Sequence, residues 1–142
     1  MPDGRFKFEL LAKYPHMKPG DVAIWERFIK ANPDYFTSVD YDVNVGEGAA
    51  FDTALNNLEG QSVAALYYKK IDVVGYKDNK ITLIEVKPAA GLTALGQINS
   101  YYELYIDKFK PASQPEIAVL TDQITPDIQN VAAKWNTLIL TA

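Results

Sequence analysis

Apolar and polar residues follow one another along the first half of the chain in patterns typical of a helix and then a strand. Apolar residues recur at helical spacing from Asp21, the expected N-cap, to Asn32, where an Asn-Pro pair stops the pattern. Residues 39–45 then alternate apolar with acidic or amide side chains, which predicts a half-buried strand. Residues 51–58 are expected to form either a short helix or an acidic excursion from the fold.

The centre of the chain predicts a β-hairpin. Residues 71–76 and 81–86 are rich in β-branched and other apolar residues, and the sequence Lys-Asp-Asn-Lys at 77–80 separates them. Asp and Asn tolerate the left-handed backbone of a tight turn, so the two segments are expected to pair as antiparallel neighbours. Because both faces of both strands are mostly apolar, the hairpin is expected to lie inside a sheet that is covered on each side.

The second half of the chain predicts a helix over residues 93–108, a strand over 117–120, a second helix that starts at Thr125 and a last strand over 137–140. The apolar stripe of the first of these helices is expected to consist of Leu95, Ile98, Tyr102, Tyr105 and Phe109. This order of elements favours an α/β fold in which a mixed sheet has helices on both faces.

Length and composition limit the kind of protein. The 142 residues suffice for a single domain, taken as residues 1–142, and 48% hydrophobic with 23% charged residues is ordinary globular composition. No apolar run approaches the roughly 20 residues of a membrane span, and no signal segment is evident, so a cytoplasmic protein with no membrane partner is expected (host cytoplasm if it is viral). The absence of cysteine excludes disulfides and thiolate metal sites.

Charge is distributed unevenly along the chain. The net charge of −4 has the wrong sign for coating nucleic acid by bulk charge. Residues 31–68 contain no Lys or Arg, whereas residues 69–87 contain five lysines against three acids. This local excess indicates an anionic partner, and its alternative is a pair of strands with solvated lysine ends.

Two acids and one lysine interrupt the apolar hairpin. If the turn is symmetric, Asp72 faces Glu85, with the Cβ atoms of such a pair about 4.5 to 5.5 Å apart. Lys87 lies two positions beyond Glu85, on the same face and roughly 7 Å along the strand. A turn longer by one residue would place the acids on opposite faces.

Two opposed carboxylates repel each other, and a hard divalent cation such as Mg²⁺ (or Mn²⁺) would neutralise them. Such a cation can activate water and offset the charge that develops on a phosphoryl group, and Lys87 would orient the water or stabilise that charge. The residues thus contain a minimal set for metal-assisted phosphodiester hydrolysis. The alternative is that Lys87 only pairs with the acids at the strand ends.

The pattern of these residues resembles the PD-(D/E)XK nuclease superfamily, including its downstream Q-x-x-x-Y motif. The segments that carry the resemblance are Ile71 to Val74, Leu83 to Lys87 and Leu95 to Tyr101. The resemblance implies a restriction-endonuclease-like α-β-β-β-α-β core, here with an extra C-terminal helix and strand. The residue before Asp72 is isoleucine where the family pattern has proline.

The resemblance also implies roles for individual residues. Asp72 and Glu85 would be metal ligands, the carbonyl oxygen of Val86 a further ligand, and Lys87 the catalytic lysine. The family often adds an acid from its first helix, for which Glu26 is the candidate; a solvated helix glutamate is the alternative.

Three further side chains are expected at the substrate. Gln97 and Tyr101 lie four apart, hence on one line of a helix, and would contact substrate or support the site; ordinary helix packing is the alternative. Lys70 is the candidate among the lysines that precede the acids.

The sequence therefore predicts a Mg²⁺- or Mn²⁺-dependent deoxyribonuclease, small enough to resemble a structure-selective or phage-type enzyme. DNA is the expected partner, and a homodimer or a larger complex would supply a wider basic surface. The alternative is a non-catalytic module with the nuclease fold that binds nucleic acid or assembles into a viral particle or repair complex.

Overall fold

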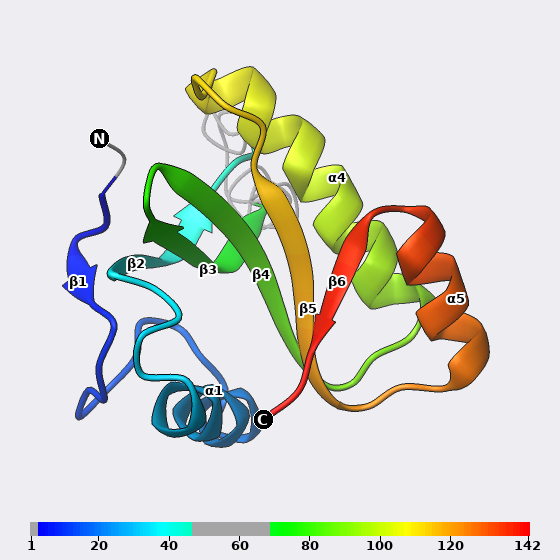
Figure 1. The fold of residues 1–142 in the computed structure, drawn as a ribbon, viewed down its shortest axis with the longest axis horizontal. Coiled ribbons are helices and arrows are strands. Elements are labelled where there is room, and N and C mark those ends of the chain that lie inside the picture. Colours follow the sequence, from blue (N-terminus) through cyan, green and yellow to red (C-terminus); the bar gives the residue numbers. More distant parts are fainter. Residues whose placement is uncertain (1–2, 47–68) are drawn as a thin grey trace, which may run out of the picture.

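The computed structural model describes residues 3–46 and 69–142 (Figure 1), so the helix or acidic excursion expected at 51–58 lies outside the described residues. The elements, in chain order, are β1 (Phe6–Lys7), α1 (Pro19–Ala31), β2 (Ser38–Asn44), β3 (Lys70–Lys77), β4 (Lys80–Ala89), α4 (Leu92–Phe109), β5 (Glu116–Gln123), α5 (Pro126–Lys134) and β6 (Thr137–Leu140). The predicted helices and strands within the described residues are thus present at nearly the expected positions.

The described strands form one mixed sheet in the order β1-β2-β3-β4-β5-β6. The first four strands are antiparallel neighbours, and β4, β5 and β6 are parallel to one another. The helices α4 and α5 provide the crossover connections that parallel strands require. The predicted α/β class with a mixed sheet is confirmed.

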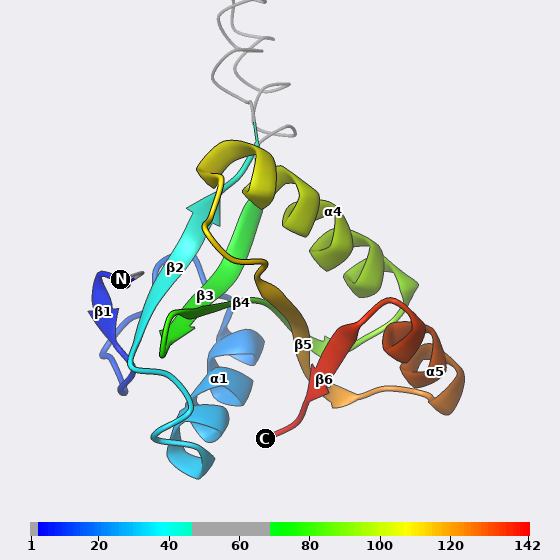
Figure 2. The same ribbon diagram turned by 45° about the horizontal axis from the view of Figure 1, so that its top comes forward.

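Two hydrophobic layers cover the sheet, with α1 on one face and α4 and α5 on the other (Figure 2). The α1 layer contains Trp25 and Phe28, whose rings stack with centroids 5.8 Å apart. The Trp25 Nε1–H donates a hydrogen bond of 2.9 Å to the Tyr41 hydroxyl, which satisfies a fully buried donor. The α4 layer is centred on Leu95 and Ile98. Burial on both faces explains why the central strands read as apolar on both sides.

The first helix begins earlier than predicted. Pro19 occupies its first turn and Lys18 is the N-cap, so the prediction of Asp21 as N-cap is wrong. Proline has a fixed φ that suits the start of a helix, which moves Asp21 into the first turn. The predicted end is confirmed, since the N–H of Asn32 closes the helix on the carbonyl of Phe28.

The stripe predicted for α4 is only partly buried. Leu95, Ile98 and Tyr105 are buried, whereas Phe109 is 46% exposed. Phe109 is the last residue of the helix, where the stripe extends past the buried cluster and the ring instead packs on Tyr105. The predicted stripe therefore extends one residue beyond the buried core.

The β3–β4 hairpin has the predicted symmetric turn. Asp78 and Asn79 have φ values of 50° and 67°, the left-handed backbone of a two-residue turn. Lys77 pairs with Lys80, and Val74 pairs with Leu83, as expected. The ladder ends at the pair Val73 and Ile84, one position before the two acids.

The middle strands change face at this point. On β2, Val39 and Tyr41 belong to the α1 layer, whereas Val43 packs against the α4 layer. The predicted half-buried strand is present. Residues two apart in an uninterrupted strand share a face, whereas the apolar residues of this strand face two different layers. The cause is Asp42, whose φ of 55° interrupts the extended backbone.

Strand β3 makes the same change, because Val73 lies in the α1 layer and Ile71 in the α4 layer. The register between β2 and β3 is the same on both sides of Asp42. In this register Asp42 lies opposite Asp72, but these two residues do not form a backbone pair. Asp72 therefore lies where the β2–β3 ladder is interrupted and the β3–β4 ladder has ended.

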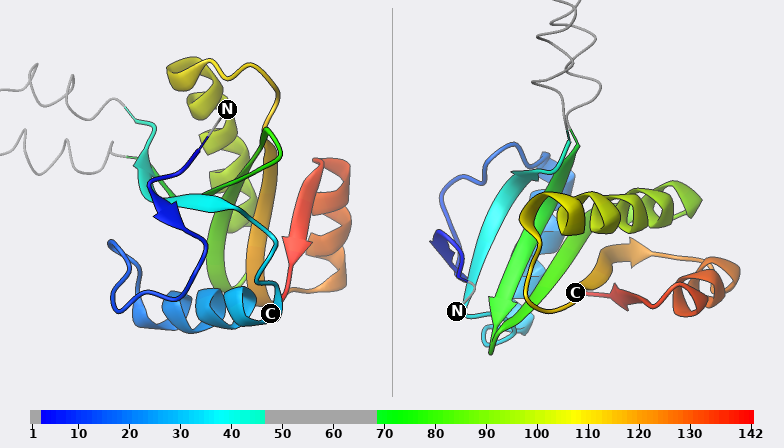
Figure 3. Two further views of the ribbon diagram at one scale, coloured as in Figure 1. Left: turned by 60° about the vertical axis from the view of Figure 1, so that its left-hand side comes forward. Right: turned by 90° about the horizontal axis from the view of Figure 1, so that it is seen from above.

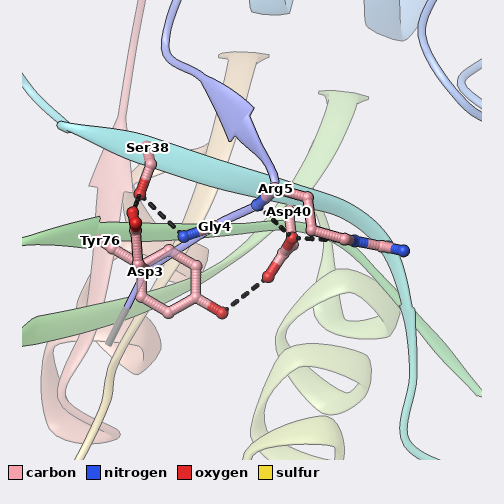
Figure 4. A network of polar contacts seen from close by, with 6 residues as sticks. All are labelled: Asp3, Gly4, Arg5, Ser38, Asp40 and Tyr76. Carbon is pink, nitrogen blue, oxygen red and sulfur yellow. Dashed lines mark hydrogen bonds and ion pairs between the residues drawn. The ribbon is translucent and has the colours of Figure 1, made fainter. Parts of the chain in front are cut away.

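The N-terminal segment is attached to β2 by side chains (Figure 4). Asp40 accepts hydrogen bonds from the backbone N–H of Arg5, from its Nε–H, and from the Tyr76 hydroxyl. Ser38 accepts from the N–H of Gly4 and donates to Asp3. These contacts hold the short β1 on one edge of the sheet.

Candidate active site

Asp72 and Glu85 come together at the interruption between the central strands. Glu85 is only 8% exposed, on β4, and Asp72 is half-buried on β3. The Asp72 Oδ2 atom accepts a hydrogen bond of 2.9 Å from the N–H of Val86. The carboxylate thus takes the place of a backbone partner beyond the end of the ladder, which fixes its position beside Glu85.

Burial and mutual repulsion oppose the ionisation of both acids. The pKa of Glu85 is raised to about 8, chiefly by burial and then by the nearby Asp72 charge, while Lys87 lowers it. The pKa of Asp72 is raised to about 6, chiefly by burial, and the Val86 N–H lowers it. A hydrogen bond between the two carboxyl groups favours the proton on Glu85. At neutral pH the pair therefore shares a proton.

A third acid, Asp21, approaches from the first turn of α1. Its charge raises the pKa of both Asp72 and Glu85. Burial raises the pKa of Asp21 itself, and the charges of Lys18 and Lys87 lower it. The first turn lies against the end of β4, since a Cβ on Gly20 would be 3.9 Å from the Pro88 Cγ atom. The Lys87 charge thus acts on two of these acids, Asp21 and Glu85.

A fourth acid, Asp42, acts on Asp72 from β2. Its charge raises the Asp72 pKa. Its Oδ2 atom lies 3.2 Å from the Lys70 Nζ atom and 3.6 Å from the His16 Nε2 atom. The predicted substrate residue Lys70 therefore lies beside the acids, with 41% of its side chain exposed, and is paired with Asp42.

The helix α4 brings Tyr101 to the same place. Burial raises the pKa of the Tyr101 phenol, and the charges of Glu85 and Asp72 raise it further. Gln97 lies one turn earlier, and its buried Oε1 atom has no hydrogen-bond partner among the residues that the structure describes. A buried amide oxygen is normally bonded, so this atom is an available acceptor.

Glu26 lies elsewhere. The Tyr14 hydroxyl donates a hydrogen bond of 2.9 Å to its Oε2 atom. The acid of α1 that affects Asp72 and Glu85 is Asp21 instead of Glu26. Glu26 is therefore not brought to the other predicted site residues.

The donor set suits a hard divalent cation. Two neighbouring carboxyl groups, the amide oxygen of Gln97 and the end of β4 provide oxygen atoms of the kind that Mg²⁺ binds. A cation would relieve the repulsion between the carboxyl groups. Within residues 3–46 and 69–142, no group of three Asp, Glu, His or Cys side chains surrounds a metal position by itself. Mg²⁺ usually retains several waters, so a site of two carboxylates remains compatible with it.

Asp21 and Asp42 were not identified as site residues from the sequence. The only local signal for Asp21 is its place at a helix start, which equally fits a cap. The signal for Asp42 is weaker still, because it continues the alternation of the strand. Both depend on how distant elements pack.

Comparison with solved structures shows the fold. The chain is similar to a repair endonuclease from Pyrococcus abyssi, with a TM-score of 0.57 and 16% identity over 94% of this chain and 50% of that one. It is also similar to EndoMS as seen in a complex with double-stranded DNA, with a TM-score of 0.51 and 16% identity over 93% and 48% of the two chains. A protein of unknown function gives a TM-score of 0.53 and 13% identity, over 86% and 55%.

These similarities define an α/β nuclease-like fold, and the chain spans about half the length of the structures that it matches. No protein-family model and no curated protein sequence matches the chain. None of the described helices is both long and apolar enough to cross a membrane.

Proposed function

We propose that the protein is a Mg²⁺- or Mn²⁺-dependent nuclease of the PD-(D/E)XK type that hydrolyses phosphodiester bonds in DNA. The observation that carries the proposal is the grouping of Asp72 and Glu85 with Lys87 where the central strands separate. Holding two carboxyl groups together in a half-buried position is costly without a cation. Binding of a divalent cation between the two carboxyl groups would offset this cost.

Each residue has a role that follows from its position. Asp72 and Glu85 would hold the cation, with the Val86 carbonyl oxygen as a further ligand, and Asp21 adds negative charge from α1. A bound cation would supply a site for water activation and offset charge on the phosphoryl group. Lys87 donates hydrogen bonds to the attacking water or to the developing negative charge. Tyr101 and Gln97 support the acids from α4.

DNA as the substrate rests on two supports. The fold is shared with a repair endonuclease and with EndoMS, which was solved with double-stranded DNA. The exposed Lys70 lies on the same strand as Asp72, where it would meet a phosphate next to the one being cut. With a net charge of −4, the chain depends on such local cations for binding.

Calorimetric titration of Mn²⁺ into the protein tests the metal site. We expect saturable binding that Asp72→Asn weakens at least tenfold, because this change removes a ligand charge. Asp78→Asn is the matched control: it makes the same substitution at the other end of β3, in the turn, and should bind as the wild type does. Equal binding by all three proteins would contradict the proposed site.

Cleavage assays test catalysis. With Mg²⁺ and duplex, single-stranded, flap and junction DNA, and with RNA for comparison, Lys87→Ala should lower the rate at least a hundredfold while it retains Mn²⁺ binding. Lys80→Ala, at the start of the same strand, should cleave normally. Cleavage that survives Lys87→Ala would point to another site. Nucleic-acid binding without cleavage in the wild type would support the non-catalytic module instead.

A further inference from the structure

The two edges of the sheet are built differently. The edge strand β1 has two residues, includes Lys7 and is tied to β2 next to Arg5. The other edge, β6, carries no charged residue and no proline from Thr137 to Thr141. Natural proteins usually protect an exposed edge with charge, proline or a short strand. The edge at β6 has neither charge nor proline.

The β6 edge is exposed at Leu138 and Thr141, whereas Thr137 is buried. Within the described part of the chain, no strand pairs with β6 on the side away from β5, and seen from above α5 lies beside the strand (Figure 3). A groove of about 1170 Å³ runs beside it, and six of its lining residues fall within positions 135–141. Leu138 is 42% exposed there. None of the candidate active-site residues lines this groove.

The sequence of the edge is its own mirror image. Thr137-Leu138-Ile139-Leu140-Thr141 reads the same in both directions about Ile139. Two antiparallel copies centred on Ile139 would therefore set threonine opposite threonine and leucine opposite leucine. Such cross-strand pairs are favourable, and the absence of charge avoids repulsion between identical strands.

The faces of the strand agree with this pairing. Leu140 packs into the α1 layer and Ile139 into the α4 layer. Leu138, two positions before Leu140, lies on the α1 side and would cover Leu140 of the second copy. A twofold axis through Ile139 uses the same surface on both copies, which closes the assembly as a dimer.

We propose that β6 is the interface between two copies of this chain, which pair antiparallel about Ile139 to form one continuous sheet. The proposal does not depend on the proposed nuclease activity, because its residues lie outside that site. It commits to a second copy because the strand is complementary to itself.

The oligomeric state of the full chain is the first test. Sedimentation velocity over a range of micromolar concentrations should show a dimer in equilibrium with the monomer. Leu138→Lys should weaken association at least tenfold, since it sets two like charges near each other at the axis. Leu10→Lys is the matched control: it makes the same change at a residue 47% exposed and outside the strand, and should dimerise as the wild type does.

Single cysteines then test the register, which the cysteine-free chain makes simple. In the proposed pairing Ile139 lies opposite itself, within disulfide reach, whereas Thr141 lies roughly 13 Å from its copy along the strand. On oxidation with diamide, Ile139→Cys should crosslink faster than Thr141→Cys, although position 141 is the more exposed. Circular dichroism checks that each variant is folded.

Several outcomes would overturn the proposal. A wild-type monomer at all concentrations would leave the edge to another partner strand. A dimer that survives Leu138→Lys, or that crosslinks faster through position 141, would place the interface elsewhere.

Discussion

At Glu85, burial and a neighbouring carboxylate both oppose ionisation. Its pKa of about 8 means that the folded protein holds a proton that an exposed glutamate gives up near pH 4.5. Between these values the folded state binds more protons than the unfolded state, so the free energy of unfolding falls as pH rises. The buried position of the Glu85 carboxyl group therefore lowers the stability of the fold at high pH, which agrees with a role in binding a cation.

Replacement of this one carboxyl group tests its cost. Without divalent metal, Glu85→Gln should raise the free energy of unfolding by at least about 2 kcal/mol at pH 9 and change it little at pH 5, because the amide does not ionise. Urea unfolding followed by tryptophan fluorescence at several pH values measures this. Glu103→Gln, on the exposed side of α4, is the control. A slope with pH that is the same in both variants would contradict the raised pKa.

At the scale of elements, the β3–β4 hairpin shows why part of the site was predictable. The Asp78-Asn79 turn is a local signal that sets the register, and the register carries Asp72 toward Glu85. The approach of Asp21 was not predictable, because the packing of α1 against the end of β4 joins residues far apart in the chain. Glu26 was predicted from the same helix because the sequence does not show which face of that helix packs near the end of β4.

The bend at Asp42 is the second feature that the pattern concealed. Apolar and polar residues alternate without a break along residues 39–45, and this pattern is typical of a strand with a single apolar face. The left-handed backbone at Asp42 divides that face between two cores. The alternation of apolar and polar residues is the same whether or not the strand changes face. The change of face could therefore not be predicted from the sequence pattern.

The turn itself offers a prediction at this scale. Asn79 has a φ of 67°, which glycine adopts without strain. Asn79→Gly should raise the free energy of unfolding by about 0.5 kcal/mol, whereas Asn79→Val should lower it by at least about 1 kcal/mol. Both are measured by urea unfolding at one pH. A stabilising valine would show that the turn is not of this type.

On the scale of the whole molecule, the sheet has a hydrophobic layer on each face and places its buried charges between them. The acids that act on Asp72 and Glu85 come from β2 and α1, so strands and a helix all contribute to one electrostatic site. Because the molecule is acidic overall, binding of a cation there should favour the folded state.

Thermal unfolding with Mn²⁺ measures this linkage. At a free concentration ten times the dissociation constant at pH 8, the metal should stabilise the fold by about 1.4 kcal/mol, or about 4 °C in Tm. The same concentration should stabilise less at pH 5.5, because the metal must then displace protons from the acids. Asp72→Asn should reduce the stabilisation to about 0.4 kcal/mol or less, and Asp78→Asn should retain it in full. Equal shifts at both pH values would count against these ligands.

The coincident bends at Asp42 and Asp72 also bear on how such a protein can change over time. The carboxyl group at position 72 is oriented by the main-chain N–H of Val86, which does not depend on the identity of most neighbouring side chains. Substitutions can therefore accumulate around it while its geometry persists. Deletion of a single residue from either strand would be more disruptive than many replacements, because it would shift position 42 relative to position 72.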